Sequence, residues 1–453
     1  MSNPSPSAVP NAVLAGWGAN LRAACHLVQP SSPHEVRAAI DPAGTIARGL
    51  GRSYGDCAIN AGKQVIGTIA MDRFLDFDPF NGILRCEAGT SLESIIETFA
   101  PRGWFPMITP GTKFVTIAGC IANDIHGKAH HAQGCFSNCV NAFTILIASG
   151  EVLNASRTEN HELFWANFGG MGLLGVILTA TIQLRKIETT YFHQKSIQVN
   201  DLEGMMAALD ENDHTFPYSV ATLDVMASGA RLGKGVLTVG DHAVLADLPP
   251  ELAANPLLVS GPPKLAVPFD LPDFTLNPAT IRIVNAVIQK IQSSARPLGH
   301  YEAFFYPLDK IAEWNRGYGR RGFTQYQFVI PFADGLAQMR KILTTILRSG
   351  ELPFLNVLKR LGKESGGTLS FPREGYTFAI DFPVRETTPA LIKRLDDMVI
   401  DMGGRIYLGK DSYTEAATFR TMYPEVDGWL ATKARYDPQN VFTSNLGRRV
   451  GLS

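Results

Sequence analysis

The stretch Ala-Arg-Gly-Leu-Gly-Arg-Ser-Tyr-Gly-Asp occupies residues 47–56 and is the most informative part of the chain. Its three glycines, spaced G-x-G-x-x-x-G among small and polar residues, leave a run of backbone N–H groups exposed, which suits phosphate oxygens. The spacing differs from the dinucleotide fingerprint G-x-G-x-x-G and from the phosphate loop G-x-x-x-x-G-K-[ST]. On its own, the stretch predicts either a phosphate cradle or a glycine-rich turn that binds nothing.

A second stretch, residues 109–128, combines small residues with polar ones at its end. The small residues at positions 116, 118, 119 and 122 would let a flat ring system lie against the chain, and His126 and Lys128 follow them. His126, His130 and His131 could instead bind a metal ion at helical spacing. No glutamate completes an H-E-x-x-H arrangement, however, and Gly127 weakens a helix here. We therefore expect no metal site and interpret His130 and His131 as structural or solvated.

A third stretch, Gly-Gly-Arg-Ile-Tyr-Leu-Gly-Lys-Asp at residues 403–411, reads as a short strand between glycines. Such a strand would project Tyr407 from one face. Lys410 could accept a proton if desolvation lowered its pKa, or it could act as a fixed positive charge. Taken by itself, Lys410 could equally be a surface lysine.

Composition excludes several classes of protein. The 453 residues allow two or three domains, and a chain with 45% hydrophobic and 18% charged residues is not largely disordered. A net charge of −1 argues against a protein that coats nucleic acid. The apolar runs are too short to span a bilayer, no secretory signal is visible, and six cysteines without a C-x-x-C pair indicate buried free thiols. We expect a protein on the cytoplasmic side, with peripheral contact to the inner membrane as an option.

Local patterns in the first part of the chain predict short strands and helices punctuated by glycine. Residues 91–99 fit a helix capped by Ser91. Residues 85–88 and 140–148 fit buried strands, and Gly150 predicts a hairpin turn after the second of them. A further β-branched strand ends near residue 187, where the character of the chain changes.

The later part predicts an antiparallel sheet with helices. Residues 323–332 and 376–383 fit strands, and residues 336–347 and 389–402 fit amphipathic helices. Residues 249–278 contain eight prolines, which we expect to exclude regular helix or sheet and to produce a surface connection or a mobile lid.

Together, these patterns resemble the flavin-dependent oxidases and dehydrogenases of the vanillyl-alcohol-oxidase superfamily, whose FAD-binding domain is of the PCMH type. The resemblance covers nearly the whole chain in one order. It comprises GWG at 16–18, RGLGRSYGD at 48–56, TPGTK at 109–113, DIHGK-x-HH at 124–131, GG-x-G-L-x-G at 169–175, WNR at 314–316, QYQFVIP at 325–331, FPREG at 371–375, GGRIYL-x-KDS at 403–412, MYP at 422–424 and DP at 437–438.

The resemblance implies an α+β fold: a PCMH-type FAD-binding domain of two subdomains plus a substrate domain built on an antiparallel sheet. We expect the FAD-binding domain at residues 1–187 and the substrate domain at 188–402, with the proline-rich mobile loop 249–278. Residues 403–453 would return to the FAD-binding domain.

The resemblance also implies which residues hold FAD. They are Ala47, Arg48, Gly49, Leu50, Gly51, Arg52, Ser53, Tyr54, Gly55, Asp56, Cys57, Gly111, Thr116, Ile117, Ala118, Gly119, Asn123, Asp124, Ile125, His126, Ile177 and Tyr407. Many members of the superfamily attach FAD to a histidine in the first glycine-rich loop. This loop has no histidine, so we expect non-covalent FAD.

The implied reaction is hydride transfer from C2 of a ribofuranose, carried on a polyprenyl phosphate, to the flavin. The 2-keto sugar would then be reduced by a partner short-chain reductase, completing an epimerisation to arabinose. Lys410 would contact the reacting hydroxyl as a base or as an electrostatic stabiliser. The residues expected to hold the sugar are Tyr54, His126, Lys128 and Gln327. Arg320 and Arg321 could hold the lipid phosphate, or they could form a solvated basic turn.

Two alternatives stay open. One is an oxidase of the same superfamily that acts on a soluble alditol or aldonolactone, and the other is a non-catalytic protein that retains the fold. The chain also departs from the family pattern, because Thr377-Phe378-Ala379 stands where the pattern has Asn-x-Cys. The activity does not require that cysteine, but inhibitors that bond its thiol should not label this protein.

Overall fold

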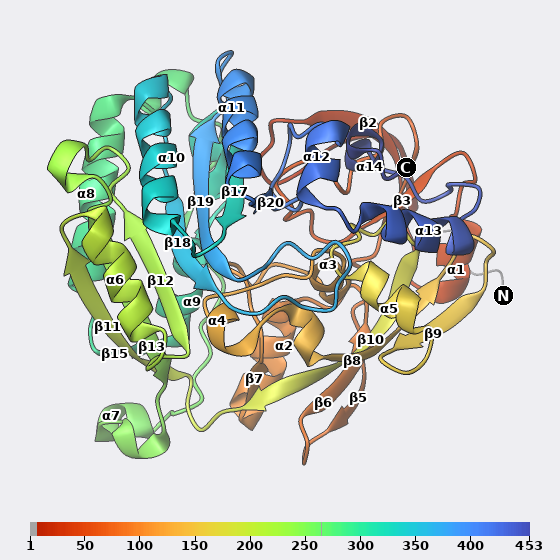
Figure 1. Cartoon of the computed structure of the whole chain (residues 1–453). Coiled ribbons are helices and arrows are strands. Elements are labelled where there is room, and N and C mark those ends of the chain that lie inside the picture. Colours follow the sequence, from red (N-terminus) through yellow and green to blue (C-terminus); the bar gives the residue numbers. More distant parts are fainter. Residues whose placement is uncertain (1–6, 264) are drawn as a thin grey trace.

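Three large β-sheets organise the chain, and the computed structural model describes residues 7–263 and 265–453 (Figure 1). The first sheet has the order β1-β2-β4-β3, with β1 antiparallel to β2 and the other neighbours parallel. Its strands are β1 (Ser7–Ala15), β2 (Arg22–Gln29), β3 (Thr45–Arg48) and β4 (Gln64–Gly67), with helix α1 (Pro33–Ala38) in the β2–β3 connection.

The second sheet is antiparallel and has the order β5-β6-β10-β8-β9, with β7 paired to the end of β10. Its strands are β5 (Phe74–Asp78), β6 (Ile83–Glu87), β7 (Trp104–Pro106), β8 (Val140–Leu146), β9 (Val152–Ser156) and β10 (Val176–Lys186). The helices between them are α2 (Leu92–Phe99), α3 (Ile117–Ala122), α4 (His130–Gln133) and α5 (His161–Asn167). The expected helix at 91–99 is confirmed, since the Ser91 side chain accepts from Ser94 N at its start. The expected hairpin is confirmed by β8 and β9, and Gly150 makes its turn at φ 82°.

The third sheet has eight strands in the order β15-β11-β13-β12-β18-β19-β17-β20, and all its described pairings are antiparallel. The strands are β11 (Tyr191–Val199), β12 (Tyr218–Leu223), β13 (Gly235–His242), β15 (Leu298–His300), β17 (Phe323–Ile330), β18 (Asn356–Leu361), β19 (Gly375–Pro383) and β20 (Arg405–Ile406). The expected strands at 323–332 and 376–383 are β17 and β19. The α+β fold with an antiparallel sheet in its second half is confirmed.

Helices cover one face of this sheet, and the other face turns toward the first half of the chain (Figure 1). The covering helices are α6 (Leu202–Asn212), α10 (Gly335–Ser349) and α11 (Thr388–Asp401), whose apolar residues share a core with Phe328 and Phe378 of the sheet. Because side chains alternate along a strand, Gln327 and Ala379 lie on the opposite face. On that face Lys359 of β18 reaches Gly127 O, 3.4 Å away.

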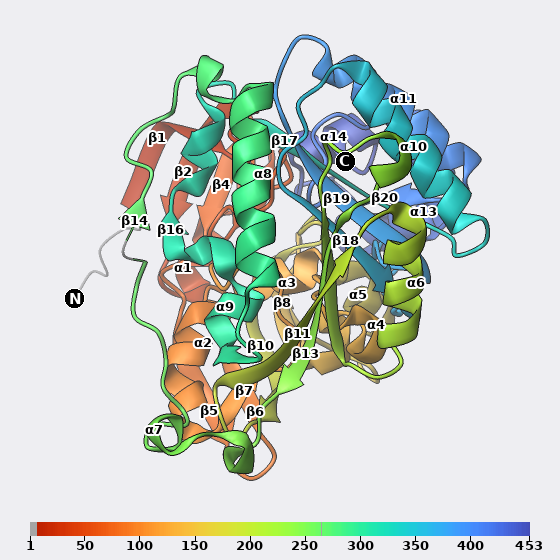
Figure 2. The same ribbon diagram turned by 90° about the vertical axis from the view of Figure 1, so that its left-hand side faces the viewer.

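The chain between β13 and β17 crosses the side of the molecule that faces the viewer in Figure 2. It contains α7 (Pro250–Ala253), β14 (Leu265–Ala266), α8 (Pro278–Ser293), α9 (Tyr301–Phe305) and β16 (Ile311–Ala312), with β14 parallel to β16. The expectation that prolines exclude regular structure from 249–278 is therefore wrong for two short elements, α7 and β14. Helix α7 starts with Pro250, a position where the missing N–H costs nothing.

The C-terminal part returns to the first sheet through α12 (Ala416–Met422), α13 (Val426–Tyr436) and α14 (Asn445–Val450). Thr45 N donates to Val441 O at 2.8 Å, and Thr443 N donates back to Thr45 O at 3.0 Å, so this part is tied to β3. All six cysteines are buried and free, as expected. No helix among the described residues is long and apolar enough to cross a membrane.

Candidate active site

The first glycine-rich stretch forms an irregular loop that leaves β3 at Arg48. Among residues 50–57, only Tyr54 donates its backbone N–H to a backbone carbonyl of the described chain, Gly409 O at 3.0 Å. Gly51 adopts φ +66°, a conformation that favours glycine. A Cβ at Gly55 would overlap the backbone carbonyl of Asp411, so this loop and the third stretch touch backbone to backbone. The loop therefore presents unused N–H groups of the kind that bind phosphate oxygens.

The second stretch forms α3 and the turn that follows it. Thr116 caps the helix by accepting from Gly119 N at 3.3 Å, and a Cβ at Gly49 would overlap the Thr116 side chain. The helix is short because Asn123 and Asp124 leave it, the latter at φ +40°. The N-terminus of α3 thus lies directly against the glycine-rich loop.

Asp124 organises the chain around this turn. Its buried carboxylate accepts hydrogen bonds from Ser137 N at 2.9 Å and from the hydroxyls of Ser365 and Ser370, each at 2.6 Å. Burial raises the pKa of Asp124, whereas these donors oppose the rise. The three donors come from both halves of the chain, so Asp124 acts as a structural junction.

Lys410 lies over the Tyr54 ring, with its Nζ 3.6 Å from the ring centroid. Desolvation lowers the pKa of Lys410 to about 7, the negative charge of Asp381 opposes that effect, and the positive charge of Lys359 adds to it. A substantial fraction of this side chain is therefore neutral near pH 7. The expectation that Lys410 could be an ordinary surface lysine does not fit its half-buried position.

Asp381 is the carboxylate whose charge raises the pKa of Lys410, and the sequence alone did not single it out. It lies on β19 opposite Gln325 of β17, accepting from Gln325 Nε2 at 2.6 Å and from the Tyr318 hydroxyl at 2.8 Å. Burial raises the pKa of Asp381 to about 7 despite these donors. Asp381 and Lys410 therefore titrate in the same range of pH.

A chain of hydrogen bonds sets the tautomer of His126. Thr377 Oγ1 donates to Phe328 O at 2.8 Å and accepts from Gln327 Nε2 at 3.2 Å, and Gln327 Nε2 also lies 3.0 Å from His126 Nε2. An amide N–H can only donate, so His126 Nε2 is the acceptor and Nδ1 carries the proton. His126 Nδ1 is buried and has no partner among the described residues. Desolvation holds the pKa of His126 well below its usual value, so the ring is neutral.

Two further lysines lie near His126. Lys128 donates to Phe304 O, and burial lowers its pKa to about 7, with a further contribution from Lys359. Burial lowers the pKa of Lys359 to about 8. Lys359 was not identified from the sequence, because an isolated lysine in an alternating strand carries no signal until the register of that strand is known.

Tyr407 and Phe371 form one wall beside His126. Their rings stack with centroids 4.9 Å apart, and His126 lies 5.3 Å from the Tyr407 centroid. The Tyr407 hydroxyl donates to Asn123 O at 3.1 Å, which fixes the ring against the second stretch. The expectation that the third stretch projects Tyr407 is met by β20 and the turn after it.

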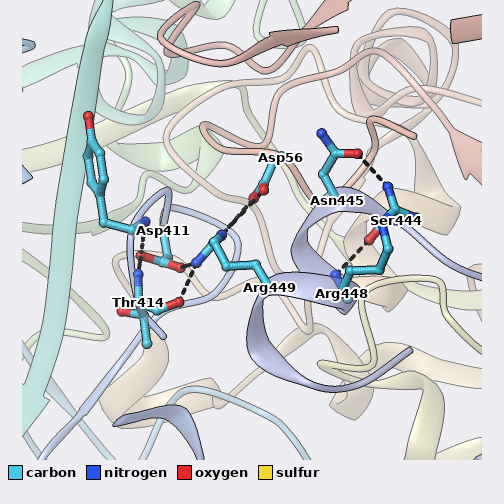
Figure 3. A network of polar contacts seen from close by, with 9 residues as sticks. Asp56, Asp411, Thr414, Ser444, Asn445, Arg448 and Arg449 are labelled. Atoms are coloured by element: carbon cyan, nitrogen blue, oxygen red, sulfur yellow. Dashed lines mark hydrogen bonds and ion pairs between the residues drawn. The ribbon is translucent and has the colours of Figure 1, made fainter. Parts of the chain in front are cut away.

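An ion-pair cluster holds the C-terminal helix to the glycine-rich loop. Arg449 of α14 lies between Asp56 and Asp411, 2.7 Å from a carboxylate oxygen of each, and donates to Thr414 O at 2.6 Å (Figure 3). The two carboxylates are buried, and their negative charges raise the pKa of Arg449. The cluster fixes the loop relative to Lys410, one residue before Asp411.

Several residues that were predicted to bind FAD or substrate make contacts within the protein instead. Arg48 donates to Ala15 O at 2.6 Å and Ala58 O at 3.1 Å, while Cys57 and Ile177 are buried in the core. Arg52 stacks on the Trp17 ring at 3.9 Å, and its Nε is buried without a partner in the described chain.

Arg320 and Arg321 are exposed, and Arg321 lies 3.7 Å from Asp273, as expected for a solvated turn. His130 contacts Cys135 Sγ at 3.2 Å, and His131 contacts Phe216 O at 2.9 Å.

This arrangement fits FAD. The unused N–H groups of residues 50–57 suit a pyrophosphate, the small residues of α3 suit a flat ring, and the unpartnered His126 Nδ1 supplies a free donor. The glycine-rich loop contains no histidine to which FAD could be attached.

Comparison with known proteins agrees with this reading. Residues 24–156 match the model of the FAD binding domain, and residues 322–450 match that of D-arabinono-1,4-lactone oxidase. The chain is 36% identical to decaprenylphosphoryl-beta-D-ribose oxidase of Mycolicibacterium smegmatis over 448 residues, which cover 97% of each chain. It is 24% identical to L-gulono-1,4-lactone dehydrogenase of Mycobacterium tuberculosis over 97% of this chain and 99% of that one.

These relatives are oxidases and dehydrogenases, so the chain is an FAD-dependent oxidoreductase acting on CH–OH groups. Its first part carries the FAD-binding domain of PCMH-type flavoproteins. With more than a third of its residues shared along nearly its whole length, the chain belongs to the decaprenylphosphoryl-β-D-ribose oxidase family.

Proposed function

We propose that this protein oxidises the 2-hydroxyl of a ribofuranose carried on a polyprenyl phosphate, giving the 2-keto sugar. The observation that carries the proposal is Lys410, a half-buried lysine with a pKa of about 7 whose Nζ lies 3.6 Å from the centroid of the Tyr54 ring. A relative with 36% identity over 97% of the chain bears the name of this activity. Bound FAD would accept the hydride in this reaction.

The side chains of the protein have separate roles in this proposal. Neutral Lys410 accepts the proton of the reacting hydroxyl, and Asp381 keeps the pKa of Lys410 from falling further. Tyr54 forms the floor beneath Lys410. His126 Nδ1 and Gln327 hold sugar hydroxyls or the flavin edge, and Lys128 with Lys359 supplies positive charge for the phosphate.

The proposal extends to the organisation of the chain and its partner. We place the FAD-binding domain at residues 1–187, the substrate domain at 188–402 and the returning segment at 403–453. FAD would be held by the residues named from the sequence, among which Arg48, Cys57, Asp124 and Ile177 support the site through their structural contacts. Because the product is a ketone, a separate reductase must consume it to complete an epimerisation.

A second candidate has one observation in its favour. The match of residues 322–450 to the lactone oxidase model supports oxidation of a soluble aldonolactone or alditol. A single experiment separates the two: anaerobic bleaching of the flavin absorbance with a polyprenyl-phosphate ribose, an alditol and an aldonolactone, with the product identified by mass spectrometry. Bleaching by the lipid-linked sugar, with loss of two mass units, supports the proposal. Bleaching by the soluble compounds alone overturns it.

A further inference from the structure

Helix α8 begins at a strong local signal that does not depend on packing. Asn277 accepts from Ala279 N at 2.9 Å and from Thr280 N at 3.2 Å, and Pro278 takes the first helical position. The helix then runs for 16 residues along the side of the molecule that Figure 2 presents to the viewer.

Helix α8 exposes most of its branched apolar residues. Its side chains at positions 281, 285, 288, 289 and 292 are buried or half-buried, and three of these five are amides. Its solvent side carries four branched apolar residues, namely Ile283, Val284, Val287 and Ile291, which are 63%, 36%, 51% and 66% exposed. An ordinary surface helix buries its apolar stripe and exposes its polar one. The fold therefore leaves the apolar stripe of α8 unused.

The inner face of α8 is held by polar contacts. Gln292 Nε2 donates to Thr222 Oγ1 at 3.0 Å, and Ser196 Oγ donates to Gln292 O at 2.7 Å. Asn285 Nδ2 and Gln289 Nε2 are buried without a partner among the described residues. Apart from Ile281 and Ile288 this face is rich in amides, so it supplies less hydrophobic stabilisation than the inner face of most surface helices.

The exposed apolar stripe continues upstream of the helix. Phe274, three residues before the N-cap, is 78% exposed, and Phe269 and Leu265 are 62% and 65% exposed. Asn277 Nδ2 donates to Phe274 O at 3.1 Å, so Phe274 is fixed at the start of α8. We define the α8 surface as Phe274, Ile283, Val284, Val287 and Ile291. Contiguous exposed apolar side chains of this kind mark a binding surface.

Basic residues predominate around the α8 surface, and its nearest acidic neighbour along the chain, Asp273, lies 3.7 Å from Arg321. No acidic residue occurs from position 274 to position 301, whereas Arg282, Lys290 and Arg296 lie in this segment. The whole chain is nearly neutral at −1, so the positive charge is local. A branched apolar stripe flanked by Lys and Arg is typical of helices that lie in the interface of an anionic bilayer. Two copies of the chain meeting through this surface would bring like charges together.

The α8 surface is connected to the candidate active site. The chain passes from α8 through β15 directly into α9, where Phe304 O accepts the hydrogen bond of Lys128. Leu258 O accepts from Thr190 Oγ1 at 2.6 Å, and Leu257 and Val259 pack against the cluster that contains Phe304. The segment before α8 is thus anchored at its start, while Leu265, Phe269 and α8 face outward.

From this exposed apolar stripe and its basic flank, we propose that the α8 surface docks the protein on an anionic phospholipid bilayer. Docking would place the candidate active site beside the phase that holds a polyprenyl chain. The inference goes beyond the proposed function, because docking requires no particular sugar.

The test uses the FAD-loaded full-length protein and sedimentation with vesicles. One set is pure phosphatidylcholine, and the other contains equal parts of phosphatidylcholine and phosphatidylglycerol. We expect binding to the anionic vesicles that weakens as salt is added. The triple variant Ile283→Ser, Val287→Ser, Ile291→Ser should bind at least about tenfold more weakly, because three apolar side chains no longer enter the interface. Arg282→Glu with Lys290→Glu should weaken binding to the anionic vesicles alone.

Phe80→Ser is the matched control, because Phe80 is 91% exposed in a different turn and lies outside the α8 surface. It should bind as the wild type does. The flavin spectrum and the melting temperature check that every variant is folded, and bleaching by a soluble, short-chain substrate separates docking from the proposed function. Equal binding by the triple variant and the wild type overturns the proposal. The proposal is also overturned if the wild type does not bind vesicles but forms dimers that the triple variant does not form. The α8 surface would then be an interface between two copies of the chain.

Discussion

Replacing Lys410 tests the core of the candidate active site. An ordinary lysine with a pKa of 10.5 is neutral in only about 3 molecules in 10,000 at pH 7, whereas Lys410 has a pKa of about 7. About half of the molecules then carry a neutral amine at that pH, which is roughly a thousandfold more base than an exposed lysine offers. Burial of the Lys410 amine beside Tyr54 thus makes an ordinary lysine an effective proton acceptor at neutral pH.

The magnitude of the effect follows from this role. Loss of a general base costs about 10² to 10⁴ in rate, or roughly 2.7 to 5.4 kcal/mol of barrier. We therefore expect Lys410→Met to keep bound, yellow FAD and to slow flavin reduction at least about a hundredfold. Lys410→Arg is the informative companion, because a guanidinium stays charged and cannot accept a proton. It should be as slow as Lys410→Met if Lys410 acts as a base.

The assay is anaerobic stopped-flow measurement of flavin absorbance across pH. In the wild type, the reduction rate should rise with pH through about 7 and then level off, because deprotonation of Lys410 produces the active form. Wild-type rates in Lys410→Met would remove Lys410 from the mechanism. A rate that falls with rising pH, together with an active Lys410→Arg, would assign Lys410 to charge stabilisation instead.

Three further changes test neighbouring parts of the site. Asp381→Asn keeps a hydrogen-bond acceptor for Tyr318 but removes the negative charge that raises the pKa of Lys410. The pH midpoint of flavin reduction should therefore move to lower pH. An unchanged midpoint would show that the charge of Asp381 does not affect Lys410. Arg449→Met leaves Asp56 and Asp411 buried without a counter-charge and should lower the free energy of unfolding by about 3 to 5 kcal/mol, as thermal unfolding will measure. Arg448→Met is the control, because the partners of Arg448 (Asn60, Thr443 and Asn445) are uncharged, and it should lower the free energy of unfolding by about 1 kcal/mol. Equal losses in the two variants would contradict the argument that Arg449 neutralises two buried carboxylates. Gly55→Ala would place a Cβ on the backbone oxygen of Asp411, so the glycine-rich loop could no longer hold FAD and the purified protein should be colourless. Gly428→Ala is the control, because the space around Gly428 is open, and it should bind FAD normally. Absorbance spectra of the two variants measure the bound flavin.

The sequence predicted those parts of the fold that local signals determine. Ser91 starts α2 because a serine side chain can satisfy the first free N–H groups of a helix. The β8–β9 hairpin follows from the buried strand expected at 140–148 and the turn at Gly150, and β17 follows from alternation around Gln325 and Gln327. The short elements α7 and β14 escaped prediction, because Pro250 starts a helix as readily as it ends one, and β14 exists only through its pairing with β16.

The candidate site was predictable only where its residues form motifs. Lys410, His126 and the glycine-rich loop stand in recognisable stretches, whereas Asp381 and Lys359 enter the site through strand register alone. A shift of β19 by one residue would turn Asp381 to the helix-covered face. The role of Arg449 could not be predicted from the sequence either, because its partner Asp56 lies 393 residues away along the chain.

The three lysines of the site place a physical constraint on how an anionic substrate can bind. Lys359 lowers the pKa of both Lys128 and Lys410, so the site already avoids holding three charged ammonium groups in one buried region. A bound phosphate would favour the protonated form of whichever lysine it contacts. If it contacted Lys410, that lysine would be held charged and could not accept a proton. If Lys410 is the base, as we propose, the phosphate lies on the side of Lys128 and Lys359, which contact Phe304 O and Gly127 O. Lys410, over the Tyr54 ring, is then left for the sugar hydroxyl.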